Sequence, residues 1–559
     1  MSNLSKIRRD KMIEFLETLK EQHSDDESLI AINQIEKELI SKRYGLVWEE
    51  HEEAVDVMMR DNIPVFTEVK ERGICMAPGE DYNFLLEGDN LHSLHLLEKT
   101  HRGKVDVIYI DPPYNTGNKD FVYDDAFVVK EDTYCHSKWL SFMSLRLNLA
   151  RNLLKDDGLI FVSISDVEQA NLRLLCNEIF GDNNFVANLV WTNKEGGGSS
   201  DSKLFRIKHE YILVYAKDIT MIEIAGVNIS NEERYKCSDE YERIRGKYYL
   251  QKLGMGSIQY SESLDYPIET PDHTYINPKD NNSGKKACWR WSKDKYMWGL
   301  KNGFIEIKKD AKGIWTVYTK QYLNCDNEGN IIKRTNRPMG IIDEFSSTQG
   351  AKTIKQLFEN VAFSYPKDVK LIKWLLQRMV KKNVTVLDFF AGSGTTAQAV
   401  LELNKEDGGQ RKFILCTNNE NKICEEITYQ RIKTVITGKR QDGSDYSEGI
   451  PANLKYYHTD FVPKSEEYLA DSLLNHVTEM IQLEHRIRID DDSYIMIMSD
   501  DEADELEKKW NEYTDIIAIY VSQDVLLTAS QEALFGSVDT YIIPDYYFNF
   551  ELREAGELW

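Results

Sequence analysis

The sequence predicts an α/β protein in which helices cover a parallel sheet. Two apolar runs have the character of buried strands, residues 105–110 (VDVIYI) and residues 158–164 (GLIFVSI). Between them, apolar side chains recur at helical spacing from Trp139 to Leu153. Strand, helix and strand in this order are typical of a unit in which both strands join one parallel sheet.

Length and composition limit the classes of protein that the chain can represent. Its 559 residues exceed what one core usually organises, so we expect several domains. No apolar run approaches the roughly 20 residues of a membrane-spanning helix, and the charged start MSNLSKIRRDKMIEF is unlike a signal peptide. The eight cysteines include no C-x-x-C pair, which favours free thiols in a reducing cytoplasm and no metal site.

Changes in periodicity and charge divide the chain into five regions. We expect an N-terminal helical region (1–80), a first α/β segment (81–192), a basic and aromatic region (193–355), a second α/β segment (356–440) and a small separate α/β domain (455–559). A glycine-rich stretch, EGGGSS at 195–200, interrupts the α/β pattern. Further strands are expected at 211–216, 384–390, 412–416, 494–498 and 516–520, with a helix at 370–376.

The net charge of −24 is unevenly distributed. Residues 465–559 hold 23 Asp and Glu against 5 Lys and Arg, whereas residues 276–338 hold 14 Lys and Arg against 6 Asp and Glu. The acidic segment is unsuited to phosphate and is either a solvated surface or a docking face for a partner protein. The basic segment suits nucleic acid, although a solvated face over an aromatic core is an equal alternative for any single residue.

A glycine-rich motif, DFFAGSGTTA, stands where a strand turns into a helix. The spacing of Gly392, Gly394 and Ala397 satisfies the general nucleotide-binding pattern, which alone fits NAD and S-adenosylmethionine about equally. Asp388 at the strand end favours the second ligand, because a carboxylate repels pyrophosphate but suits an ammonium and a sulfonium. The next strand ends near Glu420, which can accept hydrogen bonds from ribose hydroxyls.

A second motif, Asp111-Pro112-Pro113-Tyr114, follows the buried strand 105–110. The two prolines stiffen the loop, so the Asp111 carboxylate and the Pro112 carbonyl can point the same way. Such paired acceptors suit a primary amine on an aromatic ring, because they favour the pyramidal form whose lone pair attacks a methyl carbon. Tyr114 supplies a face on which a base extruded from the duplex can stack.

Together the two motifs resemble those of the β-class amino-methylating DNA methyltransferases. The resemblance identifies Asp111 to Tyr114 as the catalytic motif and the glycine-rich stretch as the cofactor motif, with the catalytic motif first in the chain. Further stretches between about residues 80 and 435 resemble the modification (Mod) subunit of type III restriction–modification systems: FLLEGDNL (84–91), HSKWL (136–140), WRWS (289–292), DEF (343–345) and FSYPK (363–367). The resemblance implies a Rossmann-like S-adenosylmethionine-dependent methyltransferase fold with circularly permuted motif order. It also implies an inserted target-recognition domain at 193–355 and an assembly domain at the C-terminal end.

Site residues and partners follow from the same resemblance. The catalytic residues, which would hold and stack a flipped adenine for methylation at N6, would be Asp111, Pro112, Pro113 and Tyr114. The residues that bind S-adenosylmethionine would be Asp388, Phe389, Phe390, Ala391, Gly392, Gly394, Thr395, Glu420 and Lys367. Relatives often carry Pro-Glu where Asn419-Glu420 stands here. The implied partners are double-stranded DNA, a second copy of the chain and an ATP-dependent restriction (Res) subunit.

Four alternatives share part of this pattern. An orphan adenine methyltransferase would work without a restriction partner. An N4-cytosine methyltransferase shares the acceptor geometry, but those enzymes commonly carry Ser at the position of Asp111. A catalytically idle DNA-specificity subunit would not need both motifs intact, and a dinucleotide oxidoreductase would bind NAD in place of S-adenosylmethionine.

Overall fold

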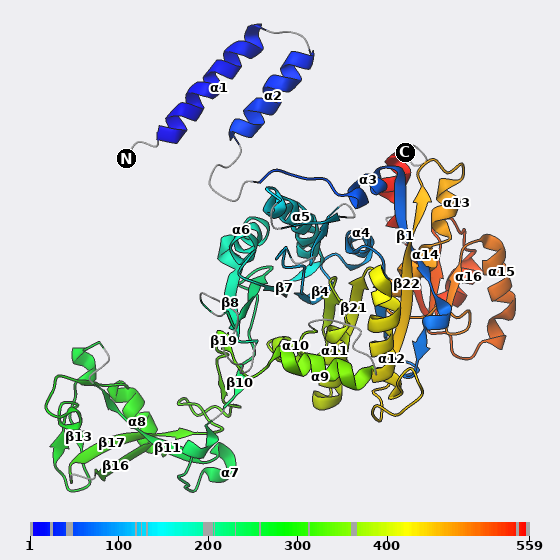
Figure 1. Ribbon diagram of the computed structural model, residues 1–559. Coiled ribbons are helices and arrows are strands. Elements are labelled where there is room, and N and C mark those ends of the chain that lie inside the picture. Colours follow the sequence, from blue (N-terminus) through cyan, green and yellow to red (C-terminus); the bar gives the residue numbers. More distant parts are fainter. Residues whose placement is uncertain are drawn as a thin grey trace. The chain divides into compact units, whose positions relative to one another are not determined.

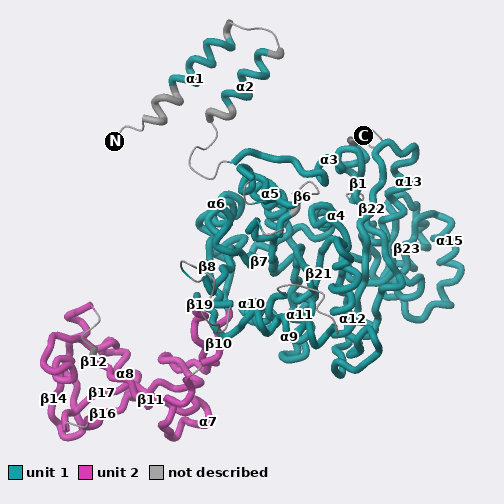
Figure 2. Tube along the Cα trace, viewed as in Figure 1, with its two compact units in different colours: residues 1–224, 340–559 teal, residues 225–339 magenta. Residues whose placement is uncertain are grey.

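In the computed structural model the chain forms two compact units (Figure 2). The first comprises residues 1–224 and 340–559, and the second comprises residues 225–339. The residues that the structure describes are 4–22, 26–40, 48–117, 120–123, 126–129, 132–193, 205, 207–229, 231–255, 259–310, 313–358, 366–543 and 547–554. The glycine-rich stretch 195–200 and residues 363–365 of the FSYPK stretch lie outside this part of the chain.

An 11-stranded sheet forms the centre of the first unit (Figure 1). Its strand order is β1 (Asn62–Glu68), β22 (Asn453–Pro463), β3 (Tyr82–Glu87), β21 (Lys412–Thr417), β20 (Thr385–Asp388), β4 (Val105–Ile110), β7 (Leu154–Ile164), β9 (Glu210–Ala216), β8 (Phe185–Trp191) and β19 (Ile341–Ile342), with β2 (Ile74–Cys75) paired to β22. From β22 to β7 all neighbouring strands are parallel. The expected mixed α/β fold with a central sheet is therefore confirmed.

Helices bury both faces of this sheet (Figure 1). One face packs against α4 (Asn90–His101), α5 (Cys135–Leu153) and α6 (Gln169–Phe180), and the other against α10 (Val369–Leu376), α11 (Thr395–Asp407) and α12 (Tyr429–Thr437). Alternation along β4 supplies both cores, because Ile108 and Ile110 join the first and Val107 and Tyr109 join the second. A strand buried on both faces explains the unbroken apolar run in the sequence.

The two ends of the first unit depart from the expected domains. The N-terminal region contains α1 (Leu4–Gln22), α2 (Asp26–Ile40) and α3 (Ala54–Asp61), but its strands β1 and β2 extend the central sheet. The prediction of a separate domain at 455–559 is wrong, because β22 lies inside the central sheet and the whole segment belongs to the first unit. The helices of this segment are α13 (Leu469–Leu474), α14 (Val477–His485), α15 (Asp500–Lys509), α16 (Ala529–Phe535) and α17 (Asn549–Glu554).

A second, three-stranded parallel sheet follows in this acidic segment, formed by β23 (Tyr494–Ile497), β24 (Ala518–Val521) and β25 (Asp539–Ile542). One face of it packs with α15 and α16 in a small core. From its other face Ala518 and Tyr520 join the main hydrophobic core, which explains why the segment is not a unit of its own.

The second unit, residues 225–339, has its own aromatic core of residues such as Trp289, Phe304 and Tyr322. Its elements are α7 (Glu242–Arg245), α8 (Lys293–Lys301), the sheet of β11 (Tyr248–Lys252), β17 (Trp315–Tyr322) and β16 (Ile305–Lys309), and the strand pairs β10–β18 (227–228, 335–336), β12–β15 (254–255, 288–289) and β13–β14 (268–269, 275–276). The unit is narrower than the expected region 193–355, because β9 pairs between β7 and β8 of the central sheet.

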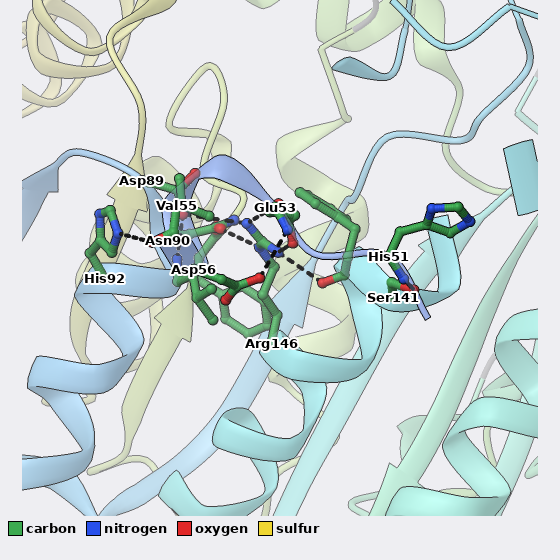
Figure 3. A network of polar contacts seen from close by, with 12 residues as sticks. His51, Glu53, Val55, Asp56, Asp89, Asn90, His92, Ser141 and Arg146 are labelled. Carbon is green, nitrogen blue, oxygen red and sulfur yellow. Dashed lines mark hydrogen bonds and ion pairs between the residues drawn. The ribbon is translucent and has the colours of Figure 1, made fainter. Parts of the chain in front are cut away.

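A fully buried arginine of α5 ties the segment before α3 to the rest of the first unit (Figure 3). Arg146 donates to both carboxylate oxygens of Glu53, at 2.6 and 3.1 Å, and to Oδ1 of Asn90 at 2.6 Å. It also lies 3.3 Å from the carboxylate of Asp89, and its guanidinium stacks 3.7 Å from the ring centre of Phe142. One cation therefore compensates the buried carboxylate of Glu53 and the partly exposed carboxylate of Asp89.

Replacing Arg146 with Met is expected to destabilise the first unit by about 3 kcal/mol, because an uncompensated buried charge remains when one partner of a buried pair is removed. Thermal unfolding monitored by circular dichroism would show this as a lower Tm. The control is Arg102→Met, whose side chain is 70% exposed and pairs with Glu98 on α4. Its effect should stay below about 0.5 kcal/mol, and equal effects of the two substitutions would contradict the account.

Candidate active site

The order of the strands brings the Asp111-Pro112-Pro113-Tyr114 motif and the glycine-rich motif to the same edge of the central sheet. β4 and β20 are neighbouring parallel strands, with Val107 opposite Val386 and Ile108 opposite Leu387. The loop of Asp111 and the turn of Gly392 follow directly after these strands. Ligands of open α/β sheets bind at this carboxyl edge.

A cavity of about 450 Å³ lies at this edge. Its lining includes residues 111–113 from the loop after β4, Phe389, Phe390 and Gly392 from the turn after β20, and Glu420 from the loop after β21. The volume falls in the range of small-molecule sites, which runs from roughly 300 to 1,000 Å³. Both motifs thus contribute to one cavity of the size that a nucleoside ligand needs.

Carboxylates dominate the charge of the cavity. Its lining contains Glu53, Asp89, Asp111, Asp120 and Glu420, and no Lys, Arg or His is among the described residues that line it. Burial raises the pKa of Glu53 despite the neighbouring Arg146 guanidinium, and burial also raises the pKa of Asp111. Clustered acidic groups of this kind attract a cation and repel phosphate. The cavity therefore suits a positively charged ligand.

The glycine motif forms a tight turn on one wall of the cavity. Gly392 and Gly394 have φ angles of 48° and 73°, in the left-handed region that favours glycine. Asp388 accepts hydrogen bonds from the amide of Phe390 at 3.0 Å and from the hydroxyl of Thr396 at 2.5 Å. Burial raises the pKa of Asp388 to about 7. Asp388 is not among the residues that line the cavity, so in this structure its carboxylate braces the turn.

Other residues expected at the cofactor also lie behind the cavity surface. Ala391, Gly394 and Thr395 are buried and are not among its lining residues. The hydroxyl of Thr395 accepts a hydrogen bond at 2.8 Å from Arg431, which also donates to the carbonyl of Ser393 at 3.1 Å. These residues hold the turn that presents Phe390 and Gly392 to the cavity.

The catalytic motif belongs to a cluster of four polar side chains. Oδ1 of Asp111 lies 2.9 Å from the hydroxyl of Tyr114 and 2.9 Å from Nζ of Lys367. The same hydroxyl is 3.0 Å from Oε2 of Glu210, which lies 3.3 Å from Nζ of Lys367. Lys367 was expected with the cofactor residues, but the structure places its ammonium on Asp111 and not in the lining of the cavity.

Burial and mutual charge set the protonation of this cluster. Burial raises the pKa of Asp111 and Glu210 raises it further, whereas Lys367 and the hydrogen bond from Tyr114 lower it. Burial opposes the charge of Lys367, but the two carboxylates outweigh it and raise the pKa of the ammonium. Burial, followed by Asp111 and Glu210, raises the pKa of the Tyr114 hydroxyl well above its usual value. Lys367 is therefore charged and Tyr114 is neutral at neutral pH.

Sequence reasoning did not assign a role to Glu53, Asp89 or Glu210. Glu53 lies in a region recognised only as helical, and its place in the cavity depends on Arg146 of a distant helix. Asp89 belongs to one of the stretches that resemble Mod subunits, and its carboxylate caps α4 by accepting from the amide of Leu91 at 2.8 Å. Glu210 directly precedes the strand predicted at 211–216, and antiparallel pairing of β9 with β7 brings it to the active edge.

Within the described part of the chain, no group of three or more His, Cys, Asp and Glu side chains is arranged to hold a metal ion. None of the described helices has the length and apolar character that crossing a membrane requires.

Comparison of the sequence with known proteins shows the family of the chain. The sequence profile described as DNA methylase matches residues 105–430. The Mod subunit of the StyLTI type III restriction-modification enzyme from Salmonella typhimurium is 35% identical over 63% of this chain, which spans only 56% of that subunit. The EcoPI Mod subunit of Escherichia phage P1 is 34% identical, with 70% of this chain and 68% of that subunit covered. The type II methyltransferase M.KpnI of Klebsiella pneumoniae is 34% identical, with 61% of this chain and 82% of that protein covered. The profile covers more than half of the sequence, and the chain belongs to the DNA methylase family.

Proposed function

We propose that the chain is an adenine-specific DNA methyltransferase, the modification subunit of a type III restriction–modification system. It transfers a methyl group from S-adenosylmethionine to the N6 amine of a flipped adenine. One observation carries this proposal: Asp111 of the catalytic motif and Gly392 of the cofactor motif line the same carboxylate-rich cavity. The Mod subunits among the relatives support it.

The lining of the cavity fits S-adenosylmethionine better than a dinucleotide. Phe389 or Phe390 would flank the adenine ring of the cofactor, and Glu420 would accept hydrogen bonds from its ribose hydroxyls. Glu53 and Asp89 offer acceptors to its ammonium group. When bound, the cofactor supplies a methyl group on a positively charged sulfur. The pyrophosphate of NAD would face five carboxylates, which disfavours the oxidoreductase alternative.

The acceptor motif orients the amine that is methylated. The Asp111 carboxylate and the Pro112 carbonyl would accept the two amine hydrogens and favour the pyramidal nitrogen. Asp111, where N4-cytosine methyltransferases commonly carry Ser, favours adenine as the target base. An idle specificity subunit is disfavoured, because both motifs are intact and meet in one cavity.

The second unit is proposed as the target-recognition domain, inserted between two halves of a methyltransferase domain with permuted motif order. Residues 225–339 hold 20 Lys and Arg against 15 Asp and Glu, in contrast to the acidic remainder of the chain. Several cations stack on aromatic rings, including Lys286 on Tyr260 at 3.9 Å and Lys295 on Trp298 at 4.6 Å. Cationic and aromatic groups of this kind suit phosphate contact and base readout.

Partners of the chain are proposed from its relatives and its charge. Mod subunits function in type III restriction–modification enzymes, so an ATP-dependent restriction (Res) subunit and a second copy of the chain are the proposed protein partners. The acidic segment 465–559 is proposed as an assembly surface, because charge there would oppose contact with DNA. Chromatography of the purified chain, with and without a Res subunit, separates this proposal from an orphan enzyme.

The function is tested by incubating the chain with methyl-labelled S-adenosylmethionine and unmethylated plasmid DNA and identifying the labelled nucleoside by mass spectrometry. We expect N6-methyldeoxyadenosine. Asp111→Ala should lower the rate at least about a hundredfold, because it removes an acceptor from the reacting amine, while DNA affinity measured by fluorescence anisotropy stays unchanged. Asp157→Ala, which removes a carboxylate paired with Lys381, serves as control. Labelled N4-methylcytosine, or full activity of Asp111→Ala, would refute the assignment.

Cofactor binding is tested separately by isothermal titration calorimetry. Gly392→Val should weaken S-adenosylmethionine binding at least about tenfold, because the branched side chain would occupy part of the cavity. In addition, the φ of 48° at this position is strained for valine. Gly79→Val is the matched control, since Gly79 also has a positive φ, of 82°, and an added Cβ there meets open space. The wild-type chain should not bind NAD. If Gly392→Val binds S-adenosylmethionine with unchanged affinity, the glycine turn is not part of the cofactor site.

A further inference from the structure

Lys367 and Glu210 surround the catalytic carboxylate with charges that neither motif supplies. Nζ of Lys367 lies 2.9 Å from Oδ1 of Asp111, 3.3 Å from Oε2 of Glu210 and 2.7 Å from the hydroxyl of Tyr114. The lysine side chain is only 11% exposed. One desolvated cation is therefore shared between two carboxylates, and only one of these, Asp111, lines the cavity.

The two oxygens of Asp111 have different surroundings. Oδ1 is bonded to both Lys367 and Tyr114, whereas no hydrogen bond to Oδ2 is found among the described residues. The side chain of Asp111 keeps 27% of its surface exposed and lies in the cavity wall. The cluster thus fixes one oxygen of the carboxylate and leaves the other available to a substrate amine.

Local packing holds Lys367 and Glu210 in place. A Cβ on Gly350 of α9 (Ser347–Leu357) would lie 2.3 Å from the carbonyl oxygen of Pro366 and 2.9 Å from that of Lys367, so this helix contacts the backbone of the lysine directly. Glu210 is fixed through its other oxygen, which accepts a hydrogen bond from Asn193 at 2.5 Å. The charges at Asp111 are therefore held by the fold and are not surface contacts.

We propose that Lys367 is a positioning residue that keeps Asp111 ionised and oriented as a hydrogen-bond acceptor, and that Glu210 is the opposing charge that limits this effect. The proposal rests on the proposed methyltransferase function. Its chemical reason is that only an ionised carboxylate accepts hydrogen bonds with both oxygens, whereas a protonated one presents a donor to the amine. In an apolar site without a neighbouring cation, a buried aspartate shifts towards its protonated form.

The charged and titratable groups around Asp111 predict opposite effects for two substitutions. These groups are Lys367, Glu210, Tyr114, Tyr109 and Asp388. The Lys367 ammonium lowers the pKa of Asp111, so its removal should raise that pKa and move the acid limb of the rate profile to higher pH. Glu210 raises the pKa of Asp111, so its neutralisation should move the limb to lower pH.

The experiment measures single-turnover methyl transfer to unmethylated plasmid DNA from pH 5.5 to 9 for the full-length chain and four variants, Lys367→Gln, Lys367→Arg, Glu210→Gln and Lys373→Gln. Lys367→Gln should shift the acid limb upward by about one pH unit, a loss of roughly tenfold on the acid side that is recovered at high pH. Glu210→Gln should shift the limb downward. The control is Lys373→Gln, which also removes a lysine flanked by two glutamates, Glu402 and Glu406, and should leave the limb in place.

Opposite shifts of the two variants support the proposal, because a merely structural role would lower the rate equally at all pH values. If Lys367→Gln has no measurable activity at any pH, two other results test the proposal. A downward shift of the acid limb in Glu210→Gln, together with a wild-type acid limb in Lys367→Arg, would support it. An unmoved limb in Glu210→Gln, or shifts in the same direction, overturns the inference while methylation by the wild type stands. Absence of methylation by the wild type overturns the proposed function itself.

Discussion

The parallel pairing of β4 with β20 is the contact on which the rest of the site depends. The Asp111 loop and the Gly392 turn are far apart in the sequence, and this pairing brings them to the carboxyl edge of one sheet. Helices on both faces bury the two strands, so the edge is a rigid support. Loops that follow rigid strands can hold a methyl donor and its acceptor at fixed separation, which is what direct transfer requires.

Electrostatics then divides this edge into two environments. The cavity is lined by five carboxylates, whereas the Lys367 ammonium lies behind one of them, Asp111. The first environment favours a cationic ligand, and the second favours an ionised acceptor for an amine. The position of Asp388 in the sequence predicted a carboxylate that faces the ligand. In the structure this carboxylate is buried, accepts hydrogen bonds from Phe390 and Thr396, and braces the turn.

The sequence predicted those parts of the fold that depend on local pattern. The strands 105–110 and 412–416 and the helix around Trp139 occur where apolar periodicity placed them, and the two motifs line one cavity. Periodicity could not show that β22 inserts into the central sheet, because strand partners are not encoded locally. For the same reason it could not show that Arg146 holds Glu53 at the cavity or that Lys367 lies on Asp111, since these contacts join distant segments.

The proposed function requires that the cavity hold the methyl donor next to Asp111. A crystal structure of the chain with S-adenosylhomocysteine, the demethylated product, measures this most directly. In this complex we expect the ribose at Glu420 and the sulfur turned towards Asp111, between the two motifs. A ligand bound outside this cavity, or one whose sulfur faces away from Asp111, would contradict it.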